Sequence, residues 1–140
     1  MRVLRKSFEE IANDLVASVP RGDELDFSEA SLSLVEEMLE WAAANRGEMS
    51  ADDQRRVIEG FGCYILEVAR RTFGGRYAWH DQTEQPVLVV GEPDKSVALM
   101  AWTKVEGRLL GDDADNIVFH FEGFAERVRK DVAGDSVIYI

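Results

Sequence analysis

The sequence predicts an α+β fold, with about four helices packed on a small, mainly antiparallel sheet of three or four strands. Apolar residues between Ser50 and Phe73 recur with a period near 3.6, as they do on one face of a helix. Those from Arg76 to Val90 fall instead into short aromatic and β-branched runs. The pair Gly74-Gly75 separates the two patterns, which indicates that a long helix ends there and a β-hairpin follows.

Capping residues and apolar spacing place the helices. Ser7 and Glu10 have the spacing of a capping box, and Pro20 ends the helix that follows them. Gly47 ends the second helix, and Asn116 or Asp115 begins the last one. The expected helices cover residues 7–19, 28–45, 50–73 and 116–131.

Three strands are expected to form an antiparallel meander, because short turns join them. They cover residues 76–80, 86–90 and 96–103. A brief helical turn is expected at 104–110, and the run Ser136–Ile140 is a candidate closing strand.

Length and composition indicate one globular domain over residues 1–140. Hydrophobic residues make up 46% of the chain, and it has no internal repeat and no linker-like tract. No apolar stretch approaches the roughly 20 residues that span a bilayer, so no membrane association is expected. The N-terminus lacks the apolar run of a signal peptide, and the single cysteine, Cys63, has no intramolecular disulfide partner. A cytoplasmic protein is therefore expected.

The net charge of −11 argues against a protein that binds nucleic acid by neutralising phosphates. The acidic residues are concentrated in residues 22–53, which contain ten of them and one basic residue, Arg46. Two interpretations stay open. The acids form ordinary solvated helix faces, or they form a docking surface for a basic protein.

The second helix carries the residues of the docking hypothesis. Its apolar side chains cover a wide arc, and the narrow ridge that remains holds four glutamates expected to project into solvent. Trp41 lies at the edge of the arc, where it either belongs to the rim of the core or contacts a partner. The predicted partner-binding residues are Glu29, Glu36, Glu37, Glu40 and Trp41.

The third helix has an apolar face on which Phe61, Ile65 and Val68 are expected to be buried against the sheet. Gly60 and Gly62 each cost about 1 kcal/mol relative to alanine inside a helix, which suggests close approach by a neighbouring element. Cys63 lies on the side of Gly60 and Glu67, where small residues would form a groove for another helix. Glu67 itself belongs to the polar side, together with Arg56, Glu59 and Arg70.

Few side chains are available for catalysis. Cys63 would need a nearby base, which His80 or His120 would have to provide. His80-Asp81 is a two-ligand fragment, whereas zinc and iron sites use three or four protein ligands, so no metal site is predicted. No glycine-rich loop follows a strand, and no cofactor is expected. Structural roles are favoured for Cys63, His80 and His120.

Several segments together resemble a family of small bacterial domains of unknown function, many of them from actinobacteria. The resemblance spans about residues 25–125. It rests on Leu25–Ser28 with Ser31-Leu32, on Gly62–Arg71, on Gly74–Trp79, and on Lys104-Val105 with Arg108-Leu109. It implies a similar fold and a cytoplasmic compartment, and it brings no activity with it.

Two classes of function remain. The favoured one is a non-enzymatic cytoplasmic interaction module whose acidic face fits a basic partner, for example an immunity or antitoxin-like protein that blocks a basic toxin. The alternative is a small hydrolase or transferase that uses Cys63 or His80. A homo-oligomer is compatible with either class.

Overall fold

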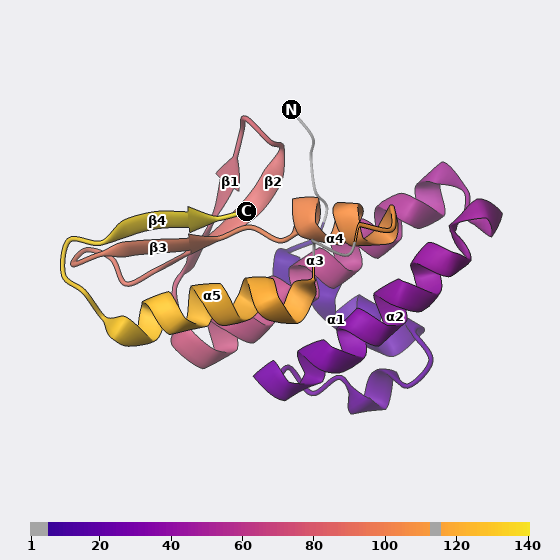
Figure 1. Ribbon diagram of the computed structural model, residues 1–140, viewed down its shortest axis with the longest axis horizontal. Coiled ribbons are helices and arrows are strands. Elements are labelled where there is room, and N and C mark those ends of the chain that lie inside the picture. The colour runs from indigo at the N-terminus through magenta and orange to yellow at the C-terminus, as the bar shows by residue number, and fades with distance from the viewer. Residues whose placement is uncertain (1–5, 113–115) are drawn as a thin grey trace.

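The computed structural model describes residues 6–112 and 116–140 and shows an α+β fold. Figure 1 shows a sheet toward one end of the long axis, with helices packed along it and beyond it. The helices of the described residues are α1 (Phe8–Ser18), α2 (Leu32–Ala44), α3 (Ala51–Phe73), α4 (Trp102–Leu109) and α5 (Ile117–Lys130). Short 3-10 turns cover Gly22–Glu24, Glu29–Ser31 and Arg46–Glu48. The strands are β1 (Arg76–His80), β2 (Gln85–Val90), β3 (Ser96–Leu99) and β4 (Ser136–Tyr139).

The sheet has the order β1-β2-β3-β4. The first three strands form the predicted antiparallel meander, with Tyr77 opposite Leu88 and Leu88 opposite Leu99. The closing strand β4 pairs in parallel with β3, so the sheet is mixed and only mainly antiparallel. The parallel pairing follows from the connection, since α4 and α5 carry the chain back to the end of the sheet at which β3 begins.

The long helix α3 is the central element of the molecule. It packs against α1 and α4 along its length and also contacts β2. Helix α5 runs beside β3 and β4, whereas α2 packs on α4 and α5 (Figure 1). Ser50 caps α3 by accepting a hydrogen bond from the Asp53 amide, and Gly74 ends it with a positive φ of 79°. The predicted helix 50–73 is therefore confirmed almost to the residue.

The segment after β3 differs from the prediction. The expected strand 96–103 ends at Leu99, and the expected brief helical turn is the two-turn helix α4, which begins at Trp102. Met100, Ala101 and Trp102 are buried as a strand assignment would require, but they are buried on the way into a helix. A short apolar run does not distinguish a buried strand from a buried helix start.

The core predictions for α3 are confirmed. Phe61, Ile65 and Val68 are buried, in one cluster with side chains from the other helices and from the sheet. The expected groove is also present, because a Cβ on Gly60 would lie 2.9 Å from Cδ1 of Leu15 in α1. A Cβ on Gly62 would overlap the Trp102 ring of α4. Both glycines therefore allow a neighbouring helix to approach α3 closely.

In the described part of the chain, every helix is too short or too polar to serve as a transmembrane span.

Candidate functional site

Helix α2 exposes a small surface that combines acidic and aromatic side chains. Glu37, Glu40 and Trp41 are all exposed, and we call these three residues the α2 patch. Trp41 leaves 66% of its surface in solvent, an unusual position for so large an apolar side chain. The spacing of three and four residues puts all three on one face of the helix.

The remaining faces of α2 explain why this one points outward. Leu32, Val35 and Leu39 are buried to within 1% of their surface, where α2 packs on α4 and α5. The helix is therefore held by its apolar side, and its orientation leaves the α2 patch on the outer side. The predicted exposure of Glu37 and Glu40 is confirmed by this arrangement, and Trp41, for which the sequence left a place in the rim of the core open, lies at the surface as well.

The prediction that Glu36 projects into solvent is wrong. Its side chain is 17% exposed and accepts a hydrogen bond of 2.7 Å from Nε of Arg108, which is itself only 8% exposed. Glu36 also accepts from Nδ2 of Asn116 at 3.3 Å and from the amide of Ile117 at 3.2 Å. It thus joins α2 to α4 and to the N-terminus of α5, where a carboxylate is favoured by unpaired amides and by the helix dipole.

Glu29 also has a partner within the fold. It lies in the 3-10 turn before α2 rather than in the helix, and its Oε1 accepts from Nη2 of Arg129 on α5 at 2.9 Å. Its side chain is 34% exposed, so this pair lies near the surface. The predicted ridge of four glutamates is therefore divided, and Glu37 and Glu40 are the two that remain fully at the surface.

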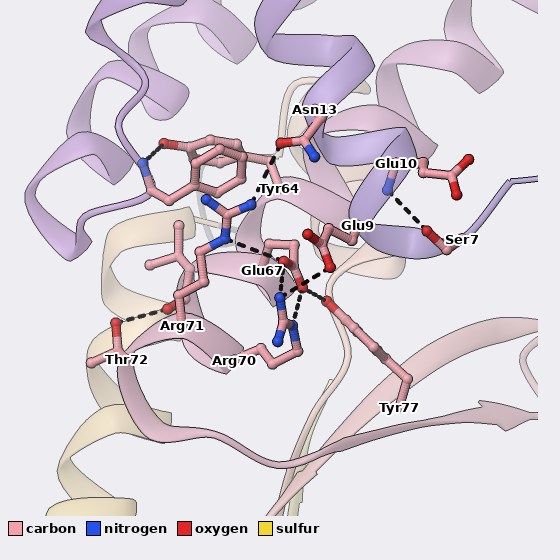
Figure 2. Close-up of polar contacts among 12 residues, drawn as sticks. Ser7, Glu9, Glu10, Asn13, Tyr64, Glu67, Arg70, Arg71, Thr72 and Tyr77 are labelled. Atoms are coloured by element: carbon pink, nitrogen blue, oxygen red, sulfur yellow. Dashed lines mark hydrogen bonds and ion pairs between the residues drawn. The ribbon is translucent and has the colours of Figure 1, made fainter.

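A second polar group, which the sequence did not single out, surrounds Glu67 on α3. Helical periodicity places Glu67 on the polar side of α3, yet its side chain is 0% exposed. Figure 2 shows its carboxylate between the side chains of Arg70, Arg71 and Tyr77. Arg70 donates to both carboxylate oxygens, at 2.6 and 2.7 Å, and the Tyr77 hydroxyl donates at 2.6 Å. We call these four residues the Glu67 cluster.

The Glu67 cluster fastens three elements together. Arg70 reaches Glu9 of α1 at 3.3 Å, Arg71 reaches Asn13 of α1 at 3.5 Å, and Tyr77 belongs to β1 (Figure 2). Burial raises the pKa of Glu67, but the hydrogen bonds from Arg70 and Tyr77 outweigh this effect and lower its pKa overall. Glu67 is thus held as a carboxylate whose oxygens are already engaged, which suits a structural role better than acid–base catalysis.

The candidate nucleophile Cys63 lies inside the core. It is 0% exposed, and burial raises the pKa of its thiol to about 12, although the nearby Trp102 indole opposes the shift. Reactive cysteines are partly exposed and have a lowered pKa, because the thiolate is the nucleophile. Cys63 has the opposite properties, since it is buried and its pKa is raised. Its small side chain allows close packing between α3 and the neighbouring elements.

We expect Cys63 to react at least about ten times more slowly with a thiol reagent in the native protein at pH 7 than in urea, because the buried thiol stays protonated. Absorbance of the released chromophore measures both rates. A control variant with Cys63→Ser and Ala44→Cys should label rapidly in both conditions, since Ala44 is exposed on α2. Rapid native labelling of Cys63, with an apparent thiol pKa below 7, would contradict the structural assignment.

The two histidines occupy ordinary structural positions. Nδ1 of His80 lies 2.6 Å from the Thr83 hydroxyl, a contact that closes the turn between β1 and β2. His120 is 8% exposed on the inner side of α5. Within residues 6–112 and 116–140, no set of three or more His, Cys, Asp and Glu side chains is arranged to hold a metal ion.

A surface cavity of about 420 Å³ lies between the first half of α3, the β1–β2 turn and the start of α4. Its walls include the carboxylates of Glu59, Glu84 and Glu106, together with Gln85 and Trp102. Gln85 is held by Thr103, whose hydroxyl accepts from its amide at 2.7 Å. Neither Cys63 nor either histidine lines this cavity. The cavity therefore does not assemble the residues that the enzymatic hypothesis would use.

Comparisons of the chain with models of protein families, with curated proteins and with solved structures found no match.

Proposed function

We propose that this protein is a cytoplasmic protein-interaction module whose α2 patch docks a basic protein, in the manner of an immunity or antitoxin-like protein. The observation that carries the proposal is the exposure of Trp41 on the same helix face as Glu37 and Glu40. The partner is inferred from chemistry alone, as a protein that presents lysine or arginine beside an apolar contact.

Trp41 has the properties of an interface anchor. Tryptophan is enriched among the residues that contribute most to protein–protein binding, because it buries a large area with little loss of side-chain freedom. At 66% exposure, Trp41 keeps most of that area available. Asn45 helps to hold the end of the helix that carries it, since its amide donates to the Trp41 carbonyl at 2.8 Å.

The charges around Trp41 select the sign of the partner. Glu37 lies one turn before Trp41 and Glu40 is adjacent, so a cation above the indole would meet two carboxylates and an aromatic face. The whole chain adds to this preference, since a net charge of −11 accelerates association with a basic protein and disfavours nucleic acid.

The enzymatic alternative receives less support from the same structure. Its nucleophile Cys63 is buried with a raised pKa, and His80 is engaged with Thr83. A binding role needs no rearrangement, because the α2 patch is already at the surface.

The α2 patch can be tested with a decaarginine peptide and the ¹⁵N-labelled protein. We expect the indole resonance of Trp41 and the amides of residues 37–44 to shift first, while the indoles of buried Trp102 and half-buried Trp79 serve as internal references. The double variant Glu37→Gln/Glu40→Gln should weaken binding several-fold at low salt, and the difference should shrink as salt screens the charges.

A matched control distinguishes the contribution of the α2 patch to peptide binding from that of the net charge of the protein. Glu122→Gln/Glu126→Gln removes the same charge from exposed positions on α5, and it should change the affinity only slightly. Equal weakening by the two double variants, or shifts spread evenly over all acidic surfaces, would show that the α2 patch is not a specific site.

A further inference from the structure

The outer edge of β4 lacks the features that usually prevent an edge strand from pairing with another chain, and it differs in this from the other edge of the sheet. The strand order places β1 and β4 at the two edges. Natural edge strands usually carry charges, prolines or bulges that prevent pairing with another chain. β1 carries Arg76 and His80 at its ends, and Arg76 forms a two-point ion pair with Glu92 at 2.6 and 3.2 Å. The segment from Ser136 to Ile140 reads Ser-Val-Ile-Tyr-Ile, without a charged side chain or a proline.

The backbone of β4 has donors and acceptors that face away from β3. The amides of Ser96 and Met100 donate to the carbonyls of Asp135 and Tyr139, each at 2.8 Å. Residues 135, 137 and 139 therefore direct their backbone groups toward β3, and alternation directs those of residues 136, 138 and 140 to the outside. Such a row of groups is a template for one more strand.

Two of these three positions carry exposed apolar side chains. Ile138 leaves 55% of its surface in solvent, and Ile140 leaves 45%. Ile138 pairs with Ala98 of β3 and so lies on the same face as the smaller apolar cluster of Val87, Ala98 and Met100. An added strand would extend this apolar face, which gives the pairing a hydrophobic contribution beyond its hydrogen bonds.

Charge favours a second copy of this chain as the added strand. A basic partner would find no acidic side chain to pair with in residues 136–140, and the nearest one, Asp135, is already bound by Arg127 at 2.6 and 2.7 Å. Two copies, each with a net charge of −11, can approach most easily where neither presents a charged side chain. Figure 1 shows β4 toward one end of the long axis and α2 toward the other. The acidic α2 regions of the two copies would therefore point away from each other.

We propose that two copies of this protein pair through β4, antiparallel about a two-fold axis at Ile138, to form one continuous eight-stranded sheet. In this register Ile138 faces Ile138 of the second copy, and Ser136 faces Ile140. Each of these facing pairs exchanges two backbone hydrogen bonds, as in any antiparallel ladder. The α2 patch takes no part in the contact, so this inference is independent of the proposed function.

Sedimentation velocity on the full chain, from about 10 μM to 1 mM, tests whether the dimer forms. Amide hydrogen exchange then tests where it forms. The amides of Ser136, Ile138 and Ile140 should gain protection as concentration rises, whereas those of Val137 and Tyr139 should be protected throughout by β3. A protein that stays monomeric at every concentration would overturn the proposal and would indicate that any strand added beside β4 comes from another protein. A dimer in which the outward amides stay unprotected would overturn it as well.

Substitution at the axis gives a second test. Ile138→Lys should weaken the dimer at least about tenfold, because symmetry places two lysines opposite each other. Leu110→Lys is the matched control, since Leu110 is similarly exposed at 58%, and it should leave the dimer unchanged. Mixing Ile138→Lys protein with Ile138→Glu protein should restore a dimer. An Ile138→Lys protein that folds and still dimerises like the original, or a mixture that stays monomeric, would overturn pairing about Ile138.

Discussion

Replacing Arg70 with methionine is expected to destabilise the protein by about 3 kcal/mol at pH 7. The substitution removes both hydrogen bonds that Arg70 donates to the buried carboxylate of Glu67. Breaking a buried ion pair costs about 3–5 kcal/mol, and the lower end applies because Arg71 and Tyr77 remain. Urea denaturation followed by circular dichroism measures the loss, with Arg55→Met as control. Arg55 forms an exposed pair with Asp52 on the same helix and should cost less than about 1 kcal/mol.

The effect of Arg70→Met should depend on pH. In the original protein the pKa of Glu67 is lowered, so its stabilising contribution is complete above the unfolded pKa of about 4.3 and is lost as pH falls through the folded pKa. In the variant the contribution of Arg70 is gone, so we expect burial to raise the pKa of Glu67 relative to the original protein and the buried carboxylate to cost stability at pH 7, a cost that protonation relieves. The difference between the two proteins should therefore shrink from pH 7 to pH 4. A constant difference would show that Arg70 acts through packing alone.

Phe61→Ala is expected to cost about 3–5 kcal/mol, because it removes a ring that is 4% exposed and leaves a cavity beside α3. Thermal and urea denaturation both measure this loss. Phe119→Ala deletes the same ring from α5, where it is 77% exposed, and should change the free energy of unfolding by no more than about 0.5 kcal/mol. Equal effects of the two substitutions would mean that the apolar face of α3 has been misassigned.

Whether a glutamate of α2 is exposed or ion-paired could not be predicted from the sequence, because its partners lie far away along the chain. Glu36 and Glu40 share one helix and one chemistry, yet Glu36 lies against Arg108 whereas Glu40 is exposed. The partners of Glu36 are about 72 to 81 residues away along the chain. Helical periodicity places a residue on a face of its own helix, but it does not identify the elements that pack there.

Glu67 could have been found in part from local spacing. Arg70 and Arg71 follow it by three and four residues, which is the spacing of ion pairs on a helix surface. The same helix side carries Gly60 and Cys63, which indicated a close neighbour. Together, these two observations predict an ion-paired carboxylate at a contact between α3 and another helix. The hydrogen bond from Tyr77 of β1 is not predictable in this way, because it depends on how the sheet packs against α3.

The sequence by itself determined the α+β class, the bounds of α3, the meander of β1–β3 and the exposure of Glu37 and Glu40, because periodicity, caps and glycine turns act over a few residues. The tertiary structure decided the rest. It made β4 parallel to β3, extended α4, buried Glu67 and divided the predicted acidic ridge, so that Glu36 and Glu29 bind arginines while Glu37 and Glu40 remain at the surface. These outcomes depend on which distant side chain comes within hydrogen-bond reach, and only the packed chain sets that distance.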